Sequence, residues 1–373
     1  MTPFIDTIIR LTIAFGLLVN CRGAKAAVPC PTNCTCAPDD RQTLVPNAYK
    51  VACDDQHLKI MPPSSDFPPF VTTLSMSRNL IPRIDIVDTF PNLLALDLSS
   101  NKIETIEPKA FAAVPKLQSL NLGYNNVKDL PVSAFDGLAS LKELNLEHNS
   151  IRKLRDDVFQ NLTLLEIVNF RGNQIRTIGE GIFKHTLRLW HLNLATNRLH
   201  NLPDNLFHEN GNLNRVDISE NQFSKVPIDT LRGAENLAEL DISANLMRNL
   251  DQYSFAGLNQ LQVLSINSMK RLRAIEAFTF SGFCKLRRLQ VTNNPFLSTL
   301  DDNAFFEPAY NRSCFALEDV DLHGNQLATL MFHTLRVCEI AKVDLRDNQW
   351  RCDCMFRWVK TCRKEDPIHQ QIT

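Results

Sequence analysis

The stretch LQSLNLGYNN, residues 117–126, places leucine at positions 117, 120 and 122 and asparagine at position 125. The same nine-residue pattern, LxxLxLxxN, appears as LLALDLSSN from Leu93 and as LKELNLEHN from Leu141. Its central L-x-L alternates as a short β-strand does, so both leucines point to one side. The pattern therefore predicts a short strand with one apolar face, which the chain leaves at an asparagine.

This pattern recurs along most of the chain. Its starts are Val71, Leu93, Leu117, Leu141, Leu165, Leu189, Leu213, Leu237, Leu261, Leu286, Leu317 and Ile340. The intervals are 22 residues, then seven of 24, then 25, 31 and 23. A fixed period of this size is typical of a solenoid, in which each coil stacks on its neighbours. Because the return segments are bulkier than the strands, we expect an α/β repeat fold curved like a horseshoe, with a parallel β-sheet on its concave face.

Two further columns of residues accompany the strands. The asparagine amide can donate to and accept from backbone groups of the turning chain that would otherwise be buried without partners. Ten residues after the asparagine comes a phenylalanine in most units, with Leu231 in the same place in one. We expect these rings to form a stacked spine in the outer half of the core. The phenylalanines are Phe111, Phe135, Phe159, Phe183, Phe207 and Phe255.

The bulk composition excludes several classes of function. The 40 Lys and Arg balance 41 Asp and Glu, whereas a nucleic-acid-binding domain is usually basic overall. The motifs G-x-S-x-G, H-E-x-x-H and the P-loop do not occur, so no enzyme and no cofactor are predicted. Single carboxylates along a rigid sheet do not close a calcium cage, so no metal is predicted.

The N-terminus has the pattern of a secretory signal. Arg10 precedes the apolar run 11–19, and Ala24 and Ala26 form a small-residue cleavage site. An uncleaved anchor fits less well because this run is too short to span ~30 Å of hydrocarbon. Cleavage after Ala26 leaves ten cysteines, which an oxidising compartment would pair as disulfides rather than as a zinc site.

The repeat LxxLxLxxNxIxxIxxxxFxxL resembles the extracellular leucine-rich repeat family, as found in Slit-like guidance proteins, Toll-like receptors and neuronal adhesion proteins. The residues around Cys30, Cys34, Cys36 and Cys53 resemble the N-terminal cysteine cap of that family, and DNQWRCDCMFRWV resembles the opening of its C-terminal cap. The resemblance implies Cys30–Cys36 and Cys34–Cys53 pairing. Together with the signal pattern and the period, these caps divide the chain into a signal peptide at 1–26, an N-terminal cap at 27–70, twelve repeats at 71–349 and the start of a C-terminal cap, which we expect to be truncated, at 350–373.

The sequence departs from the family pattern at both caps. The gap between Cys36 and Cys53 is longer than usual, and the rear cap shows Cys352, Cys354 and Cys362 before the chain stops at Thr373. We favour a fragment of a longer chain over an unusually short cap, so a membrane anchor beyond Thr373 stays open. The remaining cysteines lie near neighbouring strand starts, so Cys314 either pairs with Cys284 or Cys338 or all three are buried thiols.

Candidate binding residues lie at the variable positions of the predicted strands, where side chains change without disturbing the core. A central patch combines exposed aromatic, histidine and arginine side chains, a composition found at interface hot spots. Its members are Tyr124, His148, Arg171, Trp190, His191 and Arg215. The alternative is that these residues are ordinary surface side chains.

A second candidate is a basic cluster around Arg287 and Arg288, preceded by Lys270, Arg271, Arg273 and Lys285. It could meet an acidic protein or a sulfated polysaccharide, or simply be a solvated surface. Asn161 (NLT) and Asn311 (NRS) are glycosylation sequons that precede strands, so glycans there would leave the inner sheet free.

These observations predict an extracellular, non-catalytic protein that binds another extracellular protein with its concave face, either as a receptor or adhesion ectodomain or as a secreted binder. The alternative is a matrix component that binds collagen or glycosaminoglycan through the basic cluster.

Overall fold

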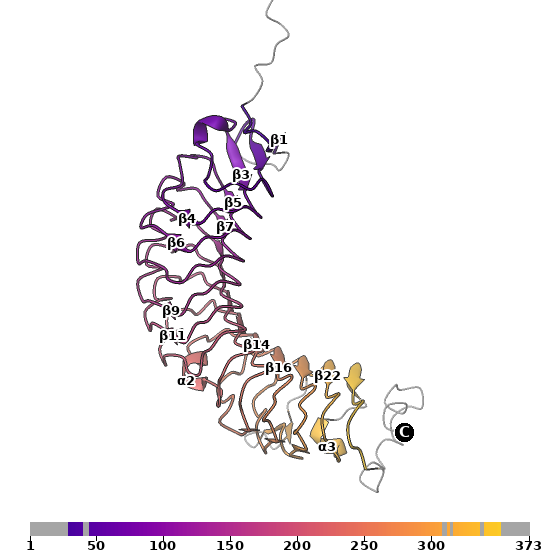
Figure 1. The fold of residues 1–373 in the computed structure, drawn as a ribbon. Helices are drawn as coiled ribbons and strands as arrows, with labels where there is room; N and C mark the ends of the chain where they lie inside the picture. The colour runs from indigo at the N-terminus through magenta and orange to yellow at the C-terminus, as the bar shows by residue number, and fades with distance from the viewer. Residues whose placement is uncertain (1–28, 40–44, 308–311, 314–315, 336–338, 352–373) are drawn as a thin grey trace, which may run out of the picture.

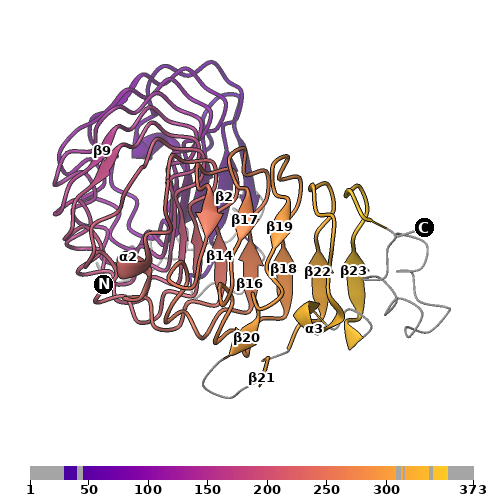
Figure 2. The same ribbon diagram turned by 90° about the horizontal axis from the view of Figure 1, so that it is seen from below.

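The computed structural model describes residues 29–39, 45–307, 312–313, 316–335 and 339–351. These residues form one stack of coils that bends into an arc (Figure 1), and a sheet lines the inner side of the arc (Figure 2). The predicted fold, a curved solenoid with a parallel sheet on its concave face, is confirmed.

The inner sheet contains fourteen strands among the described residues. In spatial order they are β1 (Thr35–Pro38), β2 (Tyr49–Ala52), β3 (Val71–Ser75), β5 (Ala95–Asp97), β7 (Ser119–Asn121), β8 (Glu143–Asn145), β10 (Ile167–Asn169), β12 (His191–Asn193), β13 (Arg215–Asp217), β14 (Glu239–Asp241), β16 (Val263–Ser265), β18 (Arg288–Gln290), β22 (Asp319–Asp321) and β23 (Lys342–Asp344). β1 and β2 pair antiparallel, and every later pair is parallel. From β3 onward each strand contains the first residue of the L-x-L part of one unit and ends before the second, so the sequence pattern predicts where each strand lies but not its bounds.

The return side of each coil is mostly turns, with short elements between them. Its strands are β4 (Arg83–Ile84), β6 (Thr105–Ile106), β9 (Lys153–Leu154), β11 (Thr177–Ile178), β15 (Asn249–Leu250), β17 (Ala274–Ile275) and β19 (Thr299–Leu300), with a hairpin of β20 (Phe306–Glu307) and β21 (Arg312–Ser313). Its helices are η1 (Ser64–Asp66), α2 (Ile228–Leu231) and α3 (Phe332–Leu335). Because these helices are single turns, the α/β class rests almost entirely on strands and turns.

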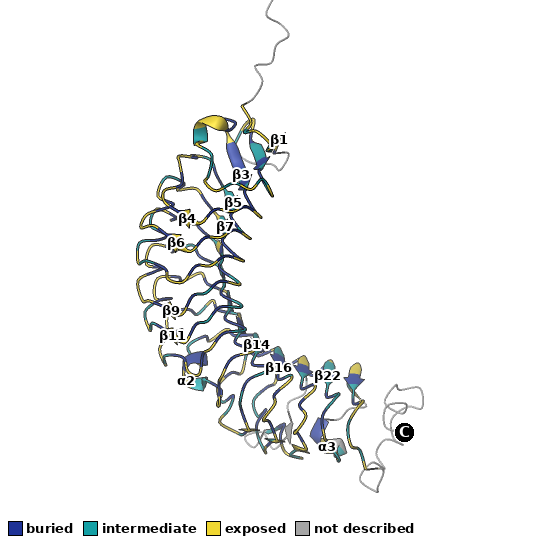
Figure 3. Cartoon of the chain, in the orientation of Figure 1, coloured by how far each residue is buried: buried dark blue, intermediate teal, exposed yellow. Residues whose placement is uncertain are grey.

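The core runs along the inside of the stack (Figure 3). Leu117, Leu120 and Leu122 are each at most 1% exposed, as the pattern predicts. The predicted spine is also present: the rings of Phe111 and Phe135 are 6.3 Å apart, and stacking continues through Phe207. Leu231 interrupts the column, which resumes at Phe255 and extends to Phe280 and Phe305.

The asparagines form a ladder between coils. The Asn125 side-chain amide donates to the carbonyls of Leu122 in its own coil and Leu98 in the preceding coil, each at 3.0 Å. Its oxygen accepts the backbone N–H of Ile103, also in the preceding coil, at 3.0 Å. The same bonds recur at Asn101, Asn149, Asn173, Asn197, Asn221 and Asn245. Each buried amide therefore satisfies backbone groups of two coils at once.

Disulfides close the front of the stack. Cys30 bonds to Cys36 and Cys34 bonds to Cys53, the pairing that the resemblance implies. Cys284 is also disulfide-bonded, so it is not a free thiol. Cys314, Cys338 and the three cysteines of the rear cap lie outside the described residues, as does the predicted signal peptide, and the division into leader, caps and repeats stays a prediction. In the part of the chain that the structure describes, no helix is long and apolar enough to cross a membrane.

The ladder predicts unequal effects for two adjacent asparagines. Asn125→Ala removes buried bonds and leaves backbone groups without partners, so we expect the free energy of unfolding to fall by roughly 2–3 kcal/mol. Asn126→Ala makes the same chemical change at an exposed neighbour and serves as the control. Urea denaturation followed by circular dichroism measures both, and equal stabilities for the two variants would contradict the role given to the ladder.

Candidate functional site

The inner face presents its side chains in columns because the parallel strands pair without a shift. Ile167 lies opposite His191 and Asn169 opposite Asn193, while Val168 between them is buried. Residues at equal places in successive coils are therefore neighbours, about 4.8 Å apart along the stack. We call this surface the inner face.

A column of Asp and Asn at the fifth place of the pattern has a structural role that the sequence analysis did not assign. Each side-chain oxygen accepts the backbone N–H two residues later, as Asp97 does from Ser99 at 2.8 Å and Asn169 does from Arg171 at 3.0 Å. Such side-chain bonds stabilise the turn by which the chain leaves the strand. We assign this column to the scaffold rather than to a ligand.

The eighth place of the pattern has a left-handed backbone in every described coil. The φ angles of these residues lie between 50° and 70° at Arg78, Ser100, Tyr124, His148, Gly172, Thr196, Glu220, Ala244, Ser268, Asn293, Gly324 and Asp347. This conformation is costly for residues other than glycine, and it persists only where the surrounding structure enforces it.

Two predicted site residues of this column form an aromatic stack. The rings of Tyr124 and His148 lie 4.6 Å apart at an interplanar angle of 18°, and Tyr124 is 52% exposed. Gly172 comes next in the column, and a Cβ there would lie 2.6 Å from His148 Nδ1. The missing side chain of Gly172 therefore makes room for the histidine ring.

A second aromatic cluster lies at the other end of the strands. Trp190 is 40% exposed and precedes β12, and its ring is 5.5 Å from that of His191. Since Tyr124 follows its strand and Trp190 precedes a strand three coils later, the predicted central patch divides into two clusters. A groove of about 340 Å³ across β7, β8 and β10 lies between them, with Ile167 among its lining residues.

The arginines of the predicted site carry acidic partners from neighbouring coils. Arg171 pairs with Glu220 at 3.3 Å, and Arg215 pairs with Glu239 at 3.3 Å.

Two arginines of the predicted basic cluster are paired in the same way. Arg287 lies 3.8 Å from Glu318, and Arg288 lies 3.2 Å from Asp319. The positive charge that the sequence suggests at these two residues is therefore balanced locally.

Two groups on the inner face titrate abnormally. Burial, followed by the Arg215 charge, lowers the pKa of His191. Burial also raises the pKa of Asp241, and the neighbouring Asp217 adds to that effect. His191 is therefore neutral at pH 7.

The structure also brings together three residues that the sequence analysis did not single out. One ligand-type atom from each of Asp321, His323 and Asp344 lies within 4.8 Å of the others. His323 Nδ1 lies 2.7 Å from Asp321, and the guanidinium of Arg346 engages Asp344, so internal partners already occupy these groups. The spacing could have been found from sequence, because Asp321 and Asp344 occupy the same place in consecutive units.

Of the two predicted glycosylation sites, Asn161 is exposed on the return side of its coil, where its amide donates to Asp136 at 2.8 Å. Asn311 lies outside the described residues. Glycosylation at both stays a prediction.

The protein thus belongs to the class of solenoid proteins, in which stacked coils form a rigid scaffold. The variable side chains of the coils form its exposed inner face. Comparison with protein families identifies which scaffold it is. A leucine rich repeat model matches residues 69–127, 91–151, 115–175 and 139–199. A model described as a BspA type leucine rich repeat region matches residues 176–311 and 224–349. Together these matches run from residue 69 to residue 349, and the chain belongs to the leucine-rich repeat proteins.

The close approach of the His148 ring to Gly172 predicts that adding a methyl group at Gly172 lowers the stability of the fold. Gly172→Ala must hold a side chain at positive φ and displace the His148 ring, so we expect a loss of about 1–2 kcal/mol in unfolding free energy. Gly211→Ala is the control, because a Cβ there meets nothing within 4 Å and its φ is not positive. Thermal and urea denaturation compare them, and an undiminished stability for Gly172→Ala would refute this account of the stack.

The environment of His191 predicts a pH effect. Because its folded pKa lies below its ordinary value of 6.5, the stability linked to neutral His191 is complete above pH 6.5. That stability is lost as the pH falls through 6.5 toward the folded pKa.

Arg215→Gln removes one of the two causes that lower the pKa of His191, so this pKa should rise. Histidine NMR measures this, with His191→Gln to assign the signal; a fall in the pKa would contradict the assignment.

Proposed function

We propose that this protein is an extracellular, non-catalytic recognition protein that binds another protein through its inner face, as a receptor or adhesion ectodomain or as a secreted binder. Leucine-rich repeat domains commonly bind proteins and are in general non-catalytic scaffolds. The two disulfides at the front support an oxidising, extracellular compartment.

The observation that carries this proposal is the placement of exposed aromatic rings on a rigid surface. Tyr124 stacks on His148 at one side of the inner face, and Trp190 contacts His191 at the other. Aromatic side chains of this kind contribute a large share of binding energy at protein interfaces. The groove between them offers a partner a concave, partly apolar surface.

Charge supports a protein partner over a polysaccharide on this face. The inner-face arginines pair with acids one or two coils away, which favours a partner carrying charges of both signs. A matrix protein that binds glycosaminoglycan would need cations free to meet sulfates, whereas Arg287 and Arg288 are paired. The matrix role therefore remains the second candidate.

The sharpest test removes the two aromatic anchors. Once a cell-surface partner is identified by proximity labelling and purified, Tyr124→Ala with Trp190→Ala should raise its Kd by at least about thirtyfold, equivalent to about 2 kcal/mol. Phe296→Ala is the matched control, since Phe296 is a 58% exposed aromatic residue beyond β18. Biolayer interferometry measures all three proteins, and an unchanged Kd in the double variant would remove the inner-face proposal.

Salt separates the two candidates in the same assay. Raising the salt from about 0.15 M to 1 M shortens the Debye length from ~8 Å to ~3 Å, so a polysaccharide complex should dissociate while an aromatic protein contact persists. Arg287→Gln with Arg288→Gln should leave protein binding nearly intact. Loss of binding in that variant together with collapse in high salt would favour the matrix role.

A further inference from the structure

The outer flank of the stack has its own backbone ladder. In the sheet β15–β17–β19, the N–H after each strand donates to the preceding coil, as Glu276 does to the Leu250 carbonyl at 2.8 Å and Asp301 does to the Ile275 carbonyl at 2.9 Å. These bonds close the flank between neighbouring coils from β15 to β19.

The ladder is broken immediately before β15. By the same rule the Asp251 N–H would donate to the Val226 carbonyl, but it donates to Ser254 Oγ at 2.9 Å. The Val226 carbonyl instead accepts the N–H of Ile228 at 2.8 Å. One coil earlier, Pro227 stands where the donor belongs and has no N–H to give. The coil of Leu213 therefore contributes no strand here, and β15 has a free edge facing it.

That edge offers hydrogen-bonding groups. The Leu250 carbonyl is used by β17, and successive residues of a strand direct their backbone groups to opposite edges. The backbone N–H and carbonyl of Asn249 therefore face the coil of Leu213. A free strand edge of this kind pairs readily with another extended chain.

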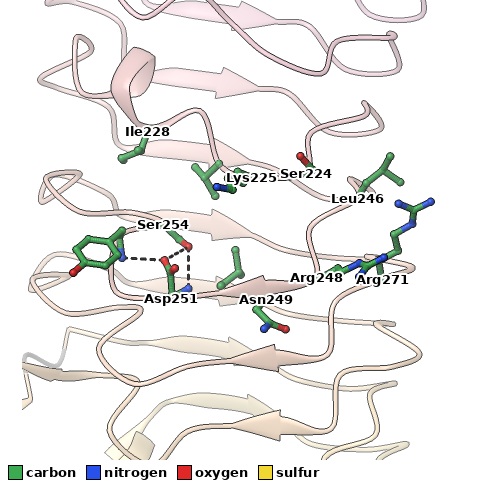
Figure 4. A pocket seen from close by; sticks show the side chains of 12 residues that line it. Ser224, Lys225, Ile228, Leu246, Arg248, Asn249, Asp251, Ser254 and Arg271 are labelled. Carbon is green, nitrogen blue, oxygen red and sulfur yellow. Dashed lines mark hydrogen bonds between the residues drawn. The ribbon is translucent and has the colours of Figure 1, made fainter.

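A pocket lies along this free edge (Figure 4). It encloses about 640 Å³, within the ~300–1,000 Å³ range of ligand pockets. Val226 and Leu250 are buried in its wall, Ile228 is half-buried, and Tyr253 at its border is 67% exposed. The pocket therefore combines apolar walls with unpaired backbone.

Three exposed cations line the same pocket: Lys225, Arg248 and Arg271. Among the described residues none of them forms an ion pair, in contrast to the arginines of the inner face. Figure 4 shows Arg248 and Arg271 on the same side of the pocket. Asp251, the acid in the lining, accepts hydrogen bonds from Tyr253 and Ser254. With three cations and one acid in its lining, the pocket has a net positive charge.

We propose that this flank pocket binds an extended, acidic peptide segment that adds as a strand to the free edge of β15. An added strand would lie about 4.8 Å from β15 and pair with the backbone of Asn249. Its alternate apolar side chains would contact Val226 and Tyr253, and its carboxylates would meet Lys225, Arg248 and Arg271. A sulfated polysaccharide would satisfy the cations alone, so the free edge and the apolar wall favour the peptide. The site lies away from the inner face and does not depend on the function proposed for it.

The test uses the full chain and a short fluorescein-labelled peptide that alternates glutamate and valine, with binding measured by fluorescence anisotropy. We expect saturable binding that Arg248→Glu with Arg271→Glu weakens by at least tenfold. Arg287→Glu with Arg288→Glu is the matched control, with the same charge change on the inner face, and should change binding less than twofold. Tyr124→Ala with Trp190→Ala should also leave it unchanged.

Backbone pairing is tested separately from charge. The same peptide with alternate N-methylated amides keeps its carboxylates but loses strand donors, so its affinity should fall at least tenfold. Asn249→Pro, which removes an N–H on the free edge, should have the same effect if its circular dichroism is native. Three results would overturn the proposal: no peptide binding at millimolar concentration, N-methylation without effect, or a heparin oligosaccharide that binds the pocket while the peptide does not.

Discussion

Each coil turns sharply as it leaves the inner sheet, and the backbone groups of that turn are buried between neighbouring coils. A buried N–H or carbonyl without a partner costs ~1–3 kcal/mol, and the turn recurs in every unit. The asparagine ladder answers this constraint, since one amide bonds to carbonyls of two coils and accepts an N–H. The leucine core supplies much of the driving force for stacking, but the ladder fixes the position of each coil relative to the next.

One unit lacks this asparagine, and it shows how the chain forms inter-coil hydrogen bonds without it. Met269 occupies the place of the amide, and its own N–H donates to Asn294 of the following coil at 2.8 Å. Asn267, two residues earlier, accepts from Thr292 of the following coil, and its N–H donates to Ser243 of the preceding one. The side chain of Asn267 thus bonds to the following coil, and its backbone N–H bonds to the side chain of Ser243 in the preceding one. The chain keeps the inter-coil bonds even where it loses the residue that usually makes them.

The strands, the buried leucines and the phenylalanine spine could be predicted from sequence because each depends on a spacing within one unit. The candidate site could be predicted only in part, since its contacts join different units. Arg171 and Glu220 are 49 residues apart, and nothing local to either residue indicates their pairing. Tyr124 and Trp190 both occupy variable places, and since the pattern puts one after its strand and the other before a strand, their separation could have been found from the sequence. The stack of Tyr124 on His148 depends on the left-handed backbone, which the residue types at that place do not indicate.

The flank pocket was missed for a related reason: it lies where a backbone N–H takes a different partner. Pro227 has no N–H, so the ladder is also interrupted one coil earlier, between the coils of Leu189 and Leu213. Facing the coil of Leu213, the Asp251 N–H donates to Ser254 Oγ instead of to that coil, so β15 has no paired strand on that side. Cations without ion pairs among the described residues lie at this interruption, whereas the arginines of the regular inner face pair with acids one or two coils away. Where the coils stack regularly, the inner-face arginines are therefore neutralised by acids of other coils. Where the flank ladder is interrupted, backbone groups of β15 and the charges of nearby cations remain available to a partner.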